Sequence, residues 1–110
     1  MLKEAKKALR VTVDFYDSEL ASLMMAGMND LKIAGVVTTQ DVSFTIGTND
    51  AVTDTSTLTD PLLMRAIITY TAMRFGNPPN YDKLLDAYET QKGQLMHADG
   101  YTDYGEGEST

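Results

Sequence analysis

Apolar residues recur at helical spacing along most of this chain, and polar residues mark where each helix begins and ends. The most apolar stretch runs from Asp60 to Gly76, where only a narrow strip, chiefly Arg65, Thr69 and Thr71, is polar. Asp60 can cap a helix, Pro61 suits the first helical position, and Gly76 suits a left-handed ending. A helix that is apolar on nearly all sides has neighbours on most of them. We therefore predict that this stretch forms the central helix of the fold.

Three further helices are expected around it. Residues 2–10 predict a short helix whose outer side is rich in lysine. A second helix begins near Asp14 or Asp17, either of which can cap it, and ends near Gly35. The fourth helix is predicted over Tyr81–His97.

Two residue types on the apolar faces have more than one interpretation. Gly27 lies within the apolar face of the second helix, where a close approach of another helix and simple tolerance of a weak residue explain it equally well. Methionines suit adaptable binding surfaces as well as cores. We expect core packing for five of them, with subunit contact as the second use: Met24, Met28, Met64, Met73 and Met96.

The stretch between the second and third helices, residues 36–59, is rich in threonine, serine and aspartate. Residues 42–46 alternate between apolar and polar, which predicts one strand of a small hairpin with residues 51–53 as its return strand. A loop of this length in a compact domain is commonly functional. We therefore expect Phe44 and Ile46 to contact a neighbouring protein.

The fold class predicted from these patterns is all-α: a bundle of about four helices in residues 1–97, with the loop 36–59 inserted. Residues 98–110 contain glycine, acids and tyrosine and little apolar surface to offset the entropy of ordering. They are predicted to form a flexible acidic tail.

Composition limits the classes of function. The 110 residues suit one domain, and the absence of cysteine excludes disulfides and thiolate metal sites. No stretch approaches the length of about 20 apolar residues needed to cross a bilayer, so no membrane contact is expected. The net charge of −7 arises mainly from four aspartates in residues 33–60 and four acids in residues 98–110. Tight binding of nucleic acid is not expected, because such binding depends on lysine and arginine.

Candidate chemistry is sparse. His97 is the only histidine, and no glycine-rich loop precedes a helix in phosphate-binding form. Asp50 and Asp54 are conceivable calcium ligands, but the loop lacks the regular acidic positions of an EF-hand and suits solvated turns better. We expect no catalytic residue, no metal site and no cofactor.

The order of these features resembles a known family. The segments LKEAKKALRV, DSELASLMMAGMNDLKIAGV, DPLLMRAIITYTAMRFGNPPN and YDKLLDAYETQKGQL are similar to head–tail connector proteins of tailed bacteriophages, over about residues 2–97. The resemblance implies a homo-oligomeric ring, a dodecamer in the virion, that binds the phage portal protein. It also implies a DNA channel that leads to a stopper or tail-completion protein, without specific DNA binding, after synthesis in the host bacterial cytoplasm.

The pattern of the central helix and the family resemblance together suggest where contacts fall. The outer face of the central helix, with Arg65, Thr69 and Met73, is the candidate subunit interface. Tyr101 and Tyr104 are candidates for docking the tail on the portal. The alternative interpretation is a small acidic helical regulator or DNA-mimic inhibitor that binds another protein.

Overall fold

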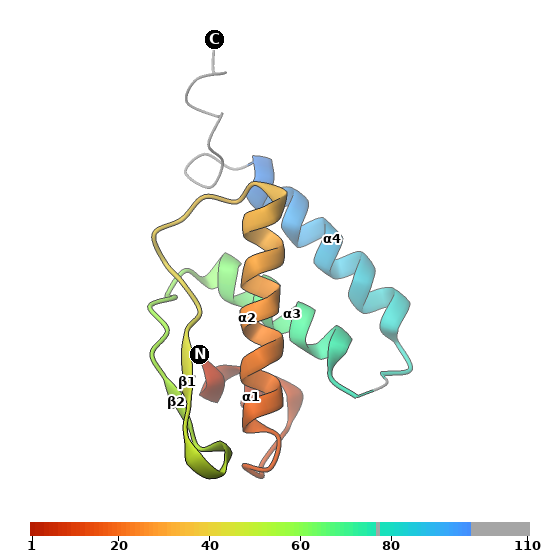
Figure 1. Ribbon diagram of the computed structural model, residues 1–110. Helices are drawn as coiled ribbons and strands as arrows, with labels where there is room; N and C mark the ends of the chain where they lie inside the picture. Colours follow the sequence, from red (N-terminus) through yellow and green to blue (C-terminus); the bar gives the residue numbers. More distant parts are fainter. Residues whose placement is uncertain (77, 98–110) are drawn as a thin grey trace.

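A computed structural model describes residues 1–76 and 78–97 and contains four helices and one two-stranded hairpin (Figure 1). The helices are α1 (Leu2–Leu9), α2 (Asp17–Ala34), α3 (Pro61–Arg74) and α4 (Tyr81–His97). Strands β1 (Phe44–Ile46) and β2 (Val52–Asp54) pair antiparallel around the short 3₁₀ turn η1 (Thr48–Asp50). The predicted helical fold and its loop between α2 and α3 are confirmed. The tail predicted for 98–110 lies outside the described residues.

Helix α3 is the centre of the fold, as predicted. It packs against both α2 and α4, and its buried residues face both neighbours. The Asp60 carboxylate accepts hydrogen bonds from the amides of Leu62 (2.9 Å) and Leu63 (3.4 Å), which satisfies donors of the first turn. The helix ends at Arg74, and Gly76 adopts a φ of 68° just beyond it, which favours glycine.

The predicted cap of α2 is wrong. The residue before the helix is Tyr16, and among the described residues no side chain caps the first turn. The carboxylates of Asp14 and Asp17 both lie 2.8 Å from the ammonium nitrogen of Lys6 on α1. The two carboxylates that were predicted to cap α2 therefore form ion pairs with a lysine of the neighbouring helix instead. The C-terminal end matches the prediction, since Gly35 has a φ of 112°.

A close approach between helices explains Gly27. A Cβ atom at this position would lie 2.9 Å from Cδ1 of Tyr70 on α3, closer than real contacts allow. Tyr70 in turn packs edge-on against Tyr88 of α4, with ring centroids 5.3 Å apart. Gly27 thus lets one aromatic side chain of α3 fill the space between α2 and α4.

The core also contains the methionines of α2. Met24 and Met28 are buried, which confirms core packing for both, and Met64 and Met96 are partly buried against the same cluster.

The hairpin agrees with the predicted alternation. Phe44 pairs with Asp54 and Ile46 with Val52, while Val42 and Phe44 point into the core. The strand face that carries these two residues covers α2.

Hydrogen bonds also join the two halves of the loop on the side of the strands that lies away from the turn. The Thr55 amide donates to the Ser43 carbonyl (2.9 Å), and the Thr57 amide donates to the Asp41 carbonyl (2.9 Å). Further along, the side-chain oxygen of Gln40 accepts hydrogen bonds from the amides of Thr59 (2.8 Å) and Asp60 (2.9 Å). Hydrogen bonds therefore join the two halves of the loop all the way from the strands to the start of α3.

Candidate assembly interface

The outer face of α3 forms one wall of an open groove. Arg65 and Thr69 lie one turn apart there, and the Thr69 hydroxyl donates to the Arg65 carbonyl (2.9 Å). The groove has a volume of about 370 Å³ and lies between α1 and α3. Its lining is mostly apolar and consists of Glu4, Pro61, Met64, Arg65, Ile68 and Thr69. We call it the α1–α3 groove.

Met73 does not belong to this groove. Its side chain is 2% exposed and lies in the core, so it cannot contact a neighbouring subunit in this conformation. The reason is helical geometry: each step of four residues turns the side chain about 40° further round the helix. Met73 is eight residues after Arg65 and is therefore turned by about 80°, toward the interior.

The two candidate loop contacts have different surroundings. Phe44 is 9% exposed and is part of the core, so it stabilises the hairpin within its own chain. Ile46 is 41% exposed and remains accessible to a partner. The candidate portal contacts Tyr101 and Tyr104 lie outside the described residues.

Two exposed apolar side chains were not singled out from the sequence. Phe15, in the link between α1 and α2, is 83% exposed, and Ile33, near the end of α2, is 77% exposed. Phe15 packs edge-on against Tyr16 (5.1 Å between ring centroids), which packs edge-on against Phe75 (5.3 Å). Apolar and polar residues alternate before α2, and this pattern includes Phe15. Periodicity alone, however, cannot show which of these apolar residues stay exposed in the fold.

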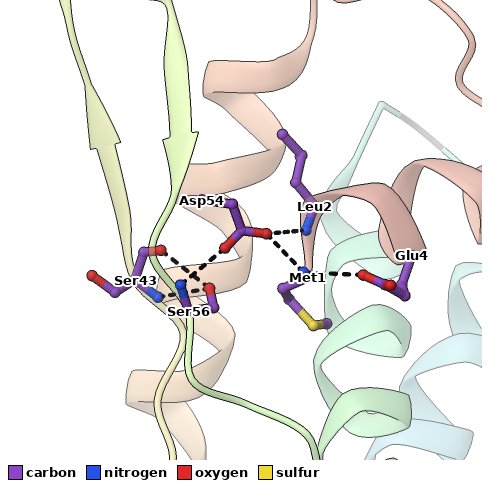
Figure 2. Close-up of polar contacts among 6 residues, drawn as sticks. All are labelled: Met1, Leu2, Glu4, Ser43, Asp54 and Ser56. Carbon is purple, nitrogen blue, oxygen red and sulfur yellow. Dashed lines mark hydrogen bonds and ion pairs between the residues drawn. The ribbon is translucent and has the colours of Figure 1, made fainter.

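A polar cluster joins α1 to the hairpin, as Figure 2 shows. The Asp54 carboxylate accepts hydrogen bonds from the Met1 amino group (2.7 Å), the Leu2 amide (2.9 Å) and the Ser56 amide (3.0 Å). The Met1 amino group also lies 3.0 Å from the Glu4 carboxylate. We call this cluster the Asp54 clamp; it uses Asp54 as a structural acceptor rather than as a solvated turn residue.

The hydrogen bonds of the Asp54 clamp shift the pKa values of Asp54 and of the Met1 amino group. Partial burial alone would raise the pKa of Asp54, but the hydrogen bonds from Met1, Leu2 and Ser56 outweigh it and hold that pKa well below its usual range. Burial likewise opposes the charge of the Met1 amino group, yet hydrogen bonds to Asp54 and Glu4 raise its pKa above 8.0. Both groups are therefore charged around neutral pH.

A second polar contact joins α2 to α4. The Tyr88 hydroxyl donates a short hydrogen bond to the Asp30 carboxylate, and the Lys92 ammonium lies 3.4 Å from the same carboxylate. Burial, followed by the hydrogen bond to Asp30, raises the pKa of Tyr88 well above its usual range. The phenol is thus a structural donor that remains protonated.

These features define a class of protein. Among residues 1–76 and 78–97, no group of three or more histidine and carboxylate side chains could hold a metal ion. No helix in the described part of the chain is long and apolar enough to cross a membrane. The described residues form a small helical bundle with an open groove and with exposed apolar side chains such as Phe15 and Ile33.

Comparison with protein families identifies the chain more closely. The family described as Phage connector protein matches residues 1–102. The chain therefore belongs to the phage connector family, a family of structural proteins, and the resemblance found in the sequence is confirmed. This membership indicates a head–tail connector role and a place in the virion beside other phage proteins. Comparison with curated proteins and with solved structures gave no match.

Proposed function

We propose that the chain is an adaptor that assembles as a ring below the phage portal and extends the DNA channel toward a stopper or tail-completion protein. The family match over residues 1–102 carries this proposal, because it covers the whole described fold. The adaptor acts by assembly and catalyses no reaction.

Ring formation requires head-to-tail contacts, in which two different patches of one subunit meet. The chain has distinct patches to offer. Phe15 precedes the first turn of α2 and Ile33 lies in its last turn, so exposed apolar side chains stand at opposite ends of one helix. The α1–α3 groove, with Arg65 and Thr69, is a third surface. Burial of apolar area between subunits would supply the driving force.

The charge suits a channel that DNA passes through. With a net charge of −7 per chain, a ring adds the fields of its subunits and repels phosphate. DNA would then slide past without specific binding. The acidic tail, with Tyr101 and Tyr104, is proposed to reach the portal.

The alternative function, a DNA mimic, needs acids displayed on a rigid face. Asp14 and Asp17 bind Lys6, and Asp30 binds Tyr88 and Lys92. Because these carboxylates are engaged within the chain, the structure favours the adaptor.

The proposal is tested in the virion and by reconstitution on purified portal. We expect the chain in isolated necks, and we expect Arg65→Glu to reduce ring assembly on the portal, measured by native mass spectrometry. Lys83→Glu is the matched control, since this exposed lysine of α4 undergoes the same charge reversal. Absence of the chain from virions would overturn the adaptor function. Equal assembly by both variants would remove only the α1–α3 groove from the interface.

A further inference from the structure

A second and larger groove lies between α1 and the hairpin. It is open, has a volume of about 580 Å³, and is mostly apolar on its inner surface. Its lining consists of Leu2, Lys3, Lys6, Lys7, Val11 and Asp54. We call it the α1–β2 groove. It is distinct from the α1–α3 groove, which shares none of these residues.

The charges around this groove are unusual for so acidic a protein. Lys6 is neutralised by Asp14 and Asp17, each 2.8 Å away. Asp54 is neutralised by the Met1 amino group at 2.7 Å. By contrast, Lys3 and Lys7 are exposed and make no ion pair with any described residue. The groove therefore presents two uncommitted ammonium groups above an apolar surface.

A segment with complementary chemistry is found in the same chain. Residues 98–110, ADGYTDYGEGEST, carry four acids and no base, together with Tyr101 and Tyr104. Carboxylates suit the two free lysines, and tyrosine rings suit an apolar surface that is bordered by polar groups. Duplex DNA would satisfy the lysines but would leave the apolar surface of the groove uncovered.

The geometry favours the tail of another copy. Lys6 contacts Asp17 at the first residue of α2, whereas Lys92 of α4 contacts Asp30, thirteen residues later and about 20 Å along the helix axis. Figure 1 shows that α4 ends at the far end of α2 from α1. Tyr101 follows His97 by four residues, a span of at most about 14 Å. Tyr101 therefore cannot reach the groove of its own chain, so a contact that uses both tyrosines must come from the tail of another copy.

We propose that the α1–β2 groove binds the acidic, tyrosine-containing tail of a second copy of this chain. Lys3 and Lys7 would bind its carboxylates, while Leu2 and Val11 would contact its tyrosine rings. This contact would hold free subunits together before assembly, and the portal would compete for the same tail. The proposal concerns the chain alone, so it can fail while the adaptor function holds.

The first test uses a fluorescent peptide of residues 98–110 and the full chain, with binding followed by fluorescence anisotropy. We expect saturable binding that weakens as salt rises from about 0.05 M to about 0.5 M, because the rim contacts are ionic. Lys7→Glu should weaken the affinity about three- to tenfold, whereas Lys83→Glu, on the distant α4, should leave it within about twofold. A peptide with alanine in place of both tyrosines should also bind more weakly.

The second test separates a contact between copies from one within a copy. The chain lacks cysteine, so Thr102→Cys accepts a single spin label. Labelled protein is mixed with unlabelled ¹⁵N protein, and broadening of the Leu2 and Val11 amide signals is expected in the mixture. Broadening of these signals only when the spin label and the ¹⁵N label are on the same molecule would overturn the proposal. So would equal weakening by Lys7→Glu and Lys83→Glu, absence of peptide binding, or tighter binding of duplex DNA at the same lysines.

Discussion

The two sides of the molecule are held together by different forces. Helices α2, α3 and α4 meet through buried apolar side chains, among them Leu31, Ile67 and Leu95. The hairpin adds a few buried residues, chiefly Val42 and Phe44, and is otherwise held by hydrogen bonds and by the Asp54 clamp (Figures 1 and 2). Apolar burial does not titrate, whereas the clamp depends on two charged groups. The hairpin should therefore unfold locally at pH values that neutralise either charged group of the clamp, while the helices stay packed.

The largest effect is expected from the apolar side. Ile67→Ala truncates a fully buried core side chain of α3 and should lower the free energy of unfolding by about 2–5 kcal/mol. Urea titration followed by circular dichroism measures it. Ile33→Ala removes the same atoms from a side chain that is 77% exposed and should change stability by less than about 0.5 kcal/mol. Equal losses would show that α3 is not the centre of the core.

A smaller loss is expected where the helices approach most closely. Gly27→Ala places a Cβ atom 2.9 Å from Tyr70 and should cost about 1–3 kcal/mol through overpacking, despite the better helix propensity of alanine. Gly93→Ala is the control, because no atom of another described residue lies within 4 Å of its new Cβ. That change should stabilise α4 by about 0.5–1 kcal/mol. Thermal denaturation should thus shift in opposite directions for the two variants, and a shift in the same direction would contradict the close approach.

The smallest effect concerns the polar side and is local. Asp54→Asn removes the charged acceptor of the clamp and should cost about 1–2 kcal/mol. Hydrogen exchange should show faster opening of the hairpin amides, with little change in α3 and α4. Asp86→Asn, at an exposed position of α4, should leave the hairpin amides unchanged.

The clamp also predicts the pH range in which the hairpin is most stable. The pKa of Asp54 is lowered in the folded state, so its contribution is complete above the ordinary value of 3.8 and is lost as the pH falls further. The pKa of the Met1 amino group is raised, so its contribution is complete below 8.0 and is lost as the pH rises beyond that value. Hairpin protection should therefore be greatest between these values in the wild type and much flatter in Asp54→Asn. Identical profiles would contradict the clamp.

Local signals in the sequence were sufficient for most of the fold. Asp60 and Pro61 start α3, and Gly35 ends α2, because capping and left-handed turns depend on residues close in sequence. The alternation around Phe44 was enough to predict the hairpin for the same reason.

The remaining features depend on partners far away in the chain. Asp14 or Asp17 was predicted to cap α2, but Lys6 on another helix binds both carboxylates. Asp54 binds a group 53 residues away, which no spacing rule indicates. Of the predicted interface, Arg65 and Thr69 share a groove while Met73 is buried, because the rotation between successive turns of the helix brings Met73 to its buried face.

The hydrogen bonds at the base of the loop have a consequence for how this chain can vary. Gln40 joins the loop's start to the entrance of α3, and the pairing of Asp41 with Thr57 and of Ser43 with Thr55 fixes both of its strands. None of these hydrogen bonds at the base of the loop uses a residue of the turn η1. Because doubling the length of a flexible loop costs only roughly 0.6 kcal/mol, residues can be inserted at the turn with little effect on folding. The hairpin tip is thus the natural place for related chains to differ in length and for an epitope or fluorophore to be added.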